Sequence, residues 1–205
     1  MYDLCIFDLD GTLIDSAADI AAALERTLGA PFTVEQVAAW VGSGVHELLR
    51  RAGATGDLDE VARRYRAEYA ADPISHTRPY VGVAATLRAL SCKKAVATNK
   101  PGGLSRTIVE RLGLGAEFFA VLGEDDVGAR KPDPRIVEVL CERAGVDRAR
   151  TLYVGDSLVD AATANAAGVD LCLVTYGYAP PGAIRAAPAK FHIDRFDGLI
   201  PILAK

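Results

Sequence analysis

Short apolar segments recur along the chain, and none of them alternates with polar residues. Runs of this kind predict strands buried on both faces, as in a parallel sheet covered by helices. The segments are LCIF (4–7), KAVAT (94–98), FAVLG (119–123), TLYVGD (151–156) and LCLVTY (171–176). A further strand followed by a helix is expected within residues 191–203.

Helical patterns separate these segments, because apolar residues recur there at spacings of three and four. Alternating strands and helices favour right-handed crossovers between parallel strands. We therefore predict an α/β fold with a doubly wound parallel sheet. The expected helices cover residues 81–90, 103–114, 134–145 and 157–168, and a surface loop with a short helix is expected at 179–189.

One long interval lacks any convincing strand. Four helical patterns follow one another there, at residues 15–28, 34–40, 44–53 and 58–72. This arrangement predicts a small helical cap domain inserted at residues 15–78. The catalytic core would then consist of residues 1–14 and 79–205.

Composition and charge narrow the range of partners. The chain has 205 residues, of which 50% are hydrophobic and 24% charged, which is typical of a globular protein. Its net charge of −4 argues against nucleic acid and anionic membranes as main partners, since both favour basic surfaces.

The redox state and the cellular compartment follow from other features. The first ten residues contain three aspartates and do not match a secretory signal, and no apolar run is long enough to span a bilayer. The four cysteines (Cys5, Cys92, Cys141 and Cys172) lack the spacing of a metal site. We expect reduced thiols in a cytoplasmic protein.

Polar residues stand at the carboxyl end of each predicted strand. In open α/β sheets, ligands bind at this edge, where the chain direction around the sheet reverses. The groups expected to meet there are Asp8, Asp10, Gly11 and Thr12 after the first strand, Thr98, Asn99 and Lys100 after the second, Lys131 after the third, and Asp156, Ser157 and Asp160 after the fourth.

Carboxylates gathered at the end of a buried strand repel one another and lose hydration. A hard divalent cation would remove this cost, and Mg²⁺ prefers oxygen ligands, including carboxylates and a substrate phosphate. Asp8 and Asp156 are the natural carboxylate ligands, and Gly11 permits a tight turn that presents a backbone carbonyl nearby. Lys131 and the Thr98 hydroxyl suit phosphate oxygens.

The same residues suggest a reaction. A carboxylate beside a phosphoryl group, here Asp8, can act as a nucleophile. A second carboxylate, Asp10, can protonate the leaving oxygen and later activate water.

The motifs together resemble those of the haloacid dehalogenase superfamily, in order and over nearly the whole chain. They are DLDGTLIDS, ATN, a Lys-Pro pair and GDSLVDAATANAAG, with the helical interval in the position of that superfamily's cap. Finer features, namely WVGSGVHELLRRA, NKP, RKPDP and TYGY, are similar to bacterial phosphoglycolate phosphatases. The resemblance implies a Mg²⁺-dependent enzyme that cleaves small phosphate monoesters.

The resemblance also implies a role for each motif residue. Asp8 would be the nucleophile and a metal ligand, and Asp10 the acid/base and a metal ligand through its carbonyl. Thr98 and Lys131 would bind the phosphoryl group, and Asp156 would be the last metal ligand. Asp160 and Ser157 would support the metal site from behind its ligands or through water.

Substrate contacts are expected on both parts of the chain. In the cap, the turn 42–44 opens a helix, and the amides of Gly44 and Val45 are candidate donors to a substrate carboxylate. In the core, Gly11 and Thr12 are expected to line the phosphate site, and Asn99 and Lys100 to orient the phosphate loop. Lys100 is also a candidate to face a substrate carboxylate.

The expected function is hydrolysis of a small phosphorylated metabolite, 2-phosphoglycolate, through an aspartyl-phosphate, by a monomer or homodimer. Alternatives are a β-phosphoglucomutase-like mutase, a pyrophosphatase or another sugar-phosphate phosphatase. A phosphoacceptor signalling domain also uses Asp, Thr and Lys on such a sheet, but the insertion and Asp10 oppose it. A dehalogenase would need neither Asp10 nor Mg²⁺, and nucleotide-binding glycine motifs do not occur in the sequence.

Overall fold

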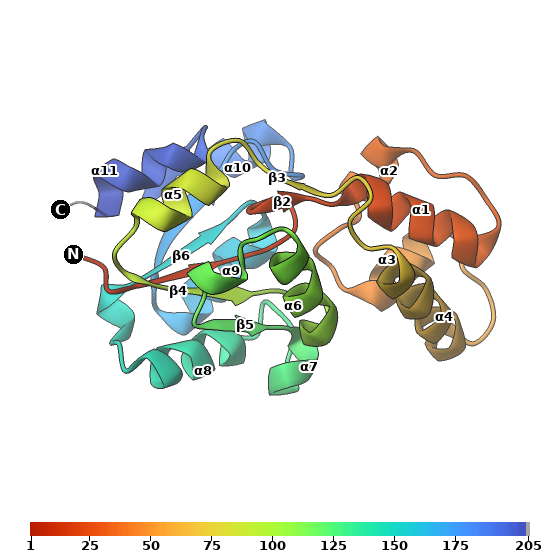
Figure 1. Cartoon of the computed structure of the whole chain (residues 1–205), viewed down its shortest axis with the longest axis horizontal. Coiled ribbons are helices and arrows are strands. Elements are labelled where there is room, and N and C mark those ends of the chain that lie inside the picture. Colours follow the sequence, from red (N-terminus) through yellow and green to blue (C-terminus); the bar gives the residue numbers. More distant parts are fainter. Residues whose placement is uncertain (204–205) are drawn as a thin grey trace.

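The computed structural model describes residues 1–203, and its centre is a sheet of six parallel strands (Figure 1). The spatial order is β5-β4-β1-β6-β7-β8: β4 and β5 are added on one side of β1, and β6, β7 and β8 on the other. The predicted doubly wound parallel sheet is therefore confirmed. The strands are β1 (Leu4–Phe7), β4 (Lys93–Ala97), β5 (Ala120–Leu122), β6 (Thr151–Gly155), β7 (Asp170–Val174) and β8 (Phe191–Ile193).

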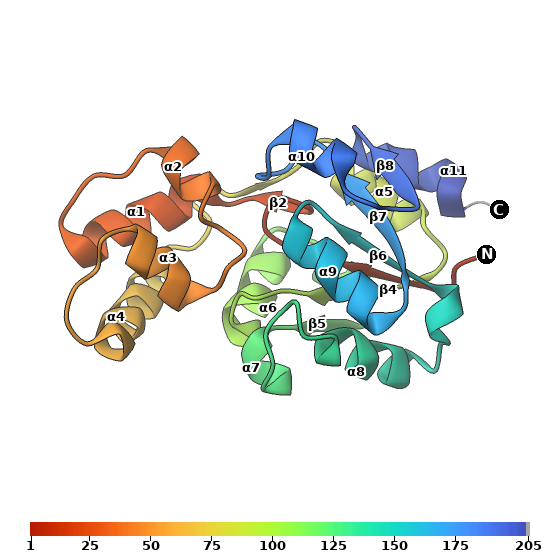
Figure 2. The same cartoon turned by 180° about the vertical axis from the view of Figure 1, so that it is seen from behind.

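Helices cover both faces of this sheet, which explains why its strands read as unbroken apolar runs (Figures 1 and 2). Alternate residues of β1 divide between two cores, because Cys5 and Phe7 face one layer while Leu4 and Ile6 face the other. The first layer contains α5 (Val83–Ala89), α6 (Gly102–Arg111) and α11 (Leu199–Leu203), and the second contains α8 (Arg135–Ala144), α9 (Leu158–Ala167) and α10 (Pro181–Ala186).

Four helices form a separate group between β1 and β4, at one end of the sheet (Figure 1). They are α1 (Ala17–Leu28), α2 (Val34–Ala38), α3 (Val45–Arg51) and α4 (Leu58–Ala71). We call this group the helical unit. Its apolar residues Ile20, Leu49 and Tyr69 belong to the same buried cluster as Phe7 of β1. The apolar core is therefore continuous from the sheet into the helical unit.

Two short strands enter and leave the helical unit side by side. β2 (Ile14–Asp15) pairs antiparallel with β3 (Arg78–Pro79), where the sequence pattern indicated no strand. Strands of two residues are too short to show alternation. The short helix α7 (Glu124–Val127) was also missed, as were the 3-10 turns η1 (Gly115–Glu117), η2 (Arg148–Arg150) and η3 (Phe196–Gly198).

The return of the chain from the helical unit is fixed by one buried carboxylate. Asp19 of α1 is 2% exposed and accepts hydrogen bonds from the amides of His76 and Thr77, at 3.0 and 2.7 Å, and from the Thr77 hydroxyl at 2.6 Å. Burial alone would raise the pKa of Asp19, but the bonds from Thr77 and His76 outweigh it and lower the pKa.

Two further expectations concern the cysteines and membranes. All four cysteines are free thiols, and the sulfur atoms of Cys5 and Cys92 lie 3.4 Å apart. Within residues 1–203, none of the helices combines the length and the apolar character needed to cross a lipid bilayer.

Replacing Asp19 should loosen the return connection. Asp19→Ala leaves the amide of Thr77 without its buried acceptor, and we expect a loss of about 1–3 kcal/mol in the free energy of unfolding at pH 7. The native pKa of Asp19 is depressed, so its contribution is present above the unfolded-state pKa. It is lost as the pH falls through the native pKa.

Urea unfolding of the wild type and Asp19→Ala between pH 7 and pH 3, followed by circular dichroism, measures this difference. Glu35→Ala is a matched control, since Glu35 is an exposed acid in the first turn of α2. A destabilisation by Asp19→Ala that stays constant over the whole pH range would contradict this explanation.

Candidate active site

The site begins at the carboxyl end of β1, where Asp8 is followed by a tight turn. Gly11 has a φ of +84°, and a Cβ there would lie 2.3 Å from Oδ2 of Asp156. Gly177 packs against the same carboxylate, since its Cβ would come within 2.4 Å of Oδ2 of Asp156. Both positions therefore require glycine, because the two loops close around the Asp156 side chain.

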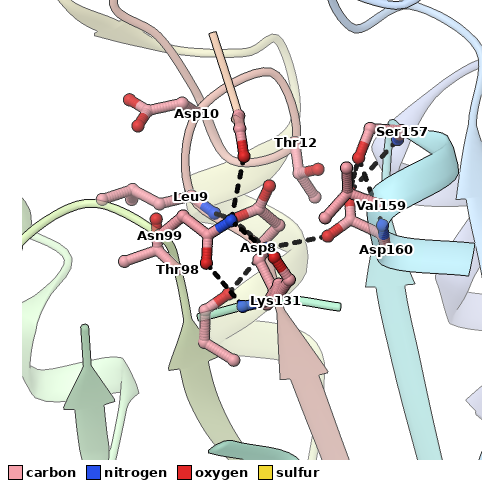
Figure 3. A network of polar contacts seen from close by, with 12 residues as sticks. Asp8, Leu9, Asp10, Thr12, Thr98, Asn99, Lys131, Ser157, Val159 and Asp160 are labelled. Atoms are coloured by element: carbon pink, nitrogen blue, oxygen red, sulfur yellow. Dashed lines mark hydrogen bonds and ion pairs between the residues drawn. The ribbon is translucent and has the colours of Figure 1, made fainter. Parts of the chain in front are cut away.

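A buried ammonium group holds two of the carboxylates together (Figure 3). Nζ of Lys131 lies 2.8 Å from Oδ1 of Asp8 and 2.8 Å from Oδ1 of Asp160. It also donates to the carbonyl of Ala97 and to the Tyr153 hydroxyl, both at 3.1 Å. All of these groups are buried, so water screens the interactions between their charges only weakly.

The group as a whole carries more negative than positive charge. Burial raises the pKa of Asp8 to about 7; Asp160 and Asp10 add to the rise, while Lys131 opposes it. Burial, Asp160 and Asp8 likewise raise the pKa of Asp156 well above its ordinary value. Burial would lower the pKa of Lys131, but Asp160 and Asp8 together hold it well above the usual range. The carboxylates thus lack a full positive counterpart.

The donor set fits a hard divalent cation. Asp8, Asp156 and Asp160 each place a carboxylate oxygen within 4.8 Å of the others. The donors to Asp8, the Leu9 amide and Lys131, both use Oδ1, and within residues 1–203 no protein donor contacts Oδ2. An oxygen cluster with excess negative charge suits Mg²⁺.

Asp160 differs from the other two acids in its partners. Its Oδ1 accepts from Lys131 and Tyr153, and its Oδ2 accepts from the Ser157 hydroxyl at 2.6 Å. Oδ2 of Asp160 also accepts from the Asp156 amide at 3.2 Å. Because protein donors contact both of its oxygens, Asp160 is placed to orient its neighbours. Ser157 caps α9 and serves the same purpose.

Asp10 lies apart from this cluster and faces the helical unit. Its Oδ1 accepts from the Ser16 hydroxyl at 2.5 Å and from Nζ of Lys100 at 2.6 Å. Lys100 also donates to the Tyr69 hydroxyl of α4 at 2.9 Å. The second carboxylate of the DLD motif is therefore held by groups from β4's loop and the inserted segment.

The residues after β4 and β1 have distinct uses. The buried Thr98 hydroxyl accepts from the Lys100 amide at 3.1 Å, which leaves its own proton for a ligand. Asn99 accepts from the Lys131 amide at 2.8 Å and donates to the carbonyl of Gly42 at 2.9 Å. Its amide thus joins the Lys131 loop to the helical unit. Thr12 donates to Oδ1 of Asp156 at 3.2 Å and orients that carboxylate.

A cavity of about 60 Å³ lies between the sheet edge and the helical unit. It brings together most of the residues predicted to bind substrate, from both parts of the chain. Its walls include Asp8, Asp10, Thr98, Asn99, Lys100 and Lys131 from the core and Gly44, Val45, Leu48, Tyr65, Arg66 and Tyr69 from the helical unit. Gly11, Thr12, Asp156, Ser157 and Asp160 are not among its lining residues.

Several tyrosines at the site escaped sequence reasoning. The Tyr178 amide donates to Oδ2 of Asp156 at 2.8 Å, and its hydroxyl accepts from the Ser16 amide at 2.6 Å. The TYGY motif marked this segment without giving it a role. Tyr153 and Tyr69 read as core residues of a strand and a helix, and no local signal distinguished them.

Comparison with known proteins places the chain in a family. Residues 5–174 match the family model described as haloacid dehalogenase-like hydrolase. A phosphoglycolate phosphatase of Cereibacter sphaeroides is 42% identical over 187 residues, covering 84% of this chain and 85% of that protein. A phosphoglycolate phosphatase of Agrobacterium fabrum is 37% identical, and the alignment covers 98% of this chain and 91% of that protein.

Comparison of the structure with solved structures leads to the same family. A crystal structure described as a predicted phosphoglycolate phosphatase from Haemophilus somnus superposes with a TM-score of 0.90 at 29% identity. The match covers 98% of this chain and 97% of that one. The sequence-based assignment to this superfamily, with likeness to its phosphoglycolate phosphatases, is confirmed. The chain is a hydrolase of the phosphoric monoester class, and it belongs to the haloacid dehalogenase-like hydrolases.

Proposed function

We propose that this protein is a Mg²⁺-dependent phosphatase that hydrolyses 2-phosphoglycolate through an aspartyl-phosphate intermediate. One observation carries the proposal. Lys131 holds Asp8 through Oδ1, while Oδ2 of Asp8 is free of protein donors within residues 1–203, and both Asp8 and Asp10 line the cavity. A fixed carboxylate with one free oxygen is what a nucleophile requires.

The chain's own residues divide the reaction between them. Oδ2 of Asp8 forms the bond to phosphorus as the ester bond breaks, and Asp10 gives its proton to the departing alkoxide. Asp10 then takes a proton from water, which attacks phosphorus and releases phosphate and free Asp8. Lys131 and the Thr98 hydroxyl hold the phosphoryl oxygens in line. Asp8, Asp156 and the Asp10 carbonyl would hold Mg²⁺, which would supply neutralisation of the phosphoryl charge.

The helical unit acts as the cap in this proposal. We assign residues 15–78 to the cap and residues 1–14 and 79–205 to the catalytic core. Contacts such as the bond from Asn99 to the Gly42 carbonyl hold the cap over the cavity. Closure would exclude bulk water during transfer, and opening would release product.

The choice of 2-phosphoglycolate has two supports. The relatives at 37–42% identity are named phosphoglycolate phosphatases. The cavity is also lined by two buried lysines, Lys100 and Lys131, and two positive charges favour a substrate that carries a second anionic group besides its phosphate.

A phosphate-release screen tests this choice against the alternatives. The panel contains 2-phosphoglycolate, glucose phosphates, β-glucose 1-phosphate with a bisphosphate activator, and pyrophosphate. We expect the highest kcat/KM for 2-phosphoglycolate, with many turnovers for each enzyme molecule. Isomerisation of a phosphosugar would indicate a mutase, and a single slow turnover would indicate a signalling domain.

The nucleophile assignment predicts the behaviour of one variant. Asp8→Asn keeps the shape of the side chain but cannot form the acyl phosphate, so kcat should fall at least about 10³-fold while the fold persists. Steady-state kinetics with 2-phosphoglycolate, together with circular dichroism, checks this. Thr163→Ser, a conservative change inside α9 away from the cavity, is the control. Turnover near that of the wild type by Asp8→Asn would exclude Asp8 as nucleophile.

Removal of the cation gives an independent prediction. Because burial raises the pKa values of Asp8 and Asp156, a dication should stabilise the folded protein as well as the reaction. EDTA should abolish phosphate release, Mg²⁺ should restore it, and Mg²⁺ should raise the melting temperature. In Asp156→Asn the rise in melting temperature should be much smaller. An active enzyme after exhaustive chelation would contradict the metal assignment.

A further inference from the structure

Lys100 is a buried cation at the junction of the sheet and the helical unit. It follows β4, its side chain is 6% exposed, and it lines the cavity. Its ammonium group lies 4.8 Å from the ring centre of Tyr69 in α4. A lysine is rarely buried to this degree unless its charge is paired, and Lys100 forms an ion pair with Asp10.

The partners of Lys100 leave one donor over. An ammonium group has three N–H bonds. Two of them are directed to Oδ1 of Asp10 at 2.6 Å and to the Tyr69 hydroxyl at 2.9 Å. Within residues 1–203 no third acceptor contacts Nζ, so one N–H remains for a ligand in the cavity.

The surroundings of Lys100 make this donor strong. Other walls of the cavity include the buried apolar side chains of Ile20 and Leu48 and the ring of Tyr65. An ion pair is screened less between such walls than in water. A negatively charged group entering here would gain more from Lys100 than from a surface lysine.

We propose that Lys100 binds the carboxylate of the substrate and so selects phosphate esters that carry a carboxylate close to the ester oxygen. This inference rests on the function proposed above. Asp10 must reach the leaving oxygen, and Lys100 lies beside Asp10. In 2-phosphoglycolate the carboxyl carbon is two bonds from that oxygen. A group that contacts Asp10 is therefore within reach of the substrate carboxylate.

Two other cations line the cavity, and they differ from Lys100. Lys131 is engaged by Asp8 and Asp160 at the phosphoryl end. Arg66 of α4 is half-buried, and no hydrogen bond from its side chain occurs in the described part of the chain. Arg66 is thus the competing candidate for the carboxylate, and it comes from the helical unit.

The test compares two substrates that share the same kind of leaving group. Ethyl phosphate, like 2-phosphoglycolate, has an alkoxide leaving group that needs a proton from Asp10. Unlike 2-phosphoglycolate, it has no carboxylate. We expect the wild type to prefer 2-phosphoglycolate. Lys100→Met should reduce the ratio of the two kcat/KM values by roughly 10- to 100-fold, the size of a hydrogen bond to a charged group. Tyr69→Phe should reduce the ratio in the same direction but less.

Arg66→Met is the matched control, since it removes a cation from the same cavity and should leave the ratio near that of the wild type. An equal fall for both substrates in Lys100→Met would overturn the inference, because Lys100 would then act only through Asp10. Loss of selectivity in Arg66→Met but not in Lys100→Met would overturn it in favour of Arg66. A wild type without preference for 2-phosphoglycolate would overturn the proposed substrate as well, whereas preference retained by Lys100→Met overturns this inference alone.

Discussion

The site depends on one buried ammonium group between two carboxylates. Lys131 contacts Asp8 at the end of β1 and Asp160 in the first turn of α9, so one ammonium group joins two separate parts of the sheet edge. A single positive charge does not balance three acids, and burial together with the repulsion between the acids raises the pKa values of Asp8 and Asp156. The fold therefore maintains a local excess of negative charge that favours a cation, and the cation in turn favours a phosphate.

The sheet makes this arrangement possible. Six parallel strands end at one edge, and the reversal between β1 and β6 leaves room there for the loops that carry Asp8 and Asp156. Gly11 and Gly177 let both loops approach the Asp156 carboxylate. Helices on both faces fix the strands, so small displacements of the acids are resisted by the packed core.

Much of this was readable from the sequence. The apolar runs of the strands, the helical insertion and the acids at strand ends are local signals, and they predicted the fold and the convergence of Asp8, Lys131 and Asp160. The contacts of Tyr178, Tyr153 and Tyr69 could not be predicted, because each depends on a partner far along the chain. The β2–β3 pair escaped for a different reason, since two residues carry no periodicity.

The paired strands β2 and β3 have a mechanical consequence. The two connections to the helical unit run side by side in this pair, so a movement of the unit as the proposed cap would turn about one short axis. Tyr178 spans from that axis to the acids: its hydroxyl accepts from the amides of Ser16 and Ala17, and its own amide donates to Asp156. In the proposed enzyme, a swing of the helical unit would therefore displace the residue that holds Asp156, and the position of the cap would be coupled to the geometry of the carboxylates.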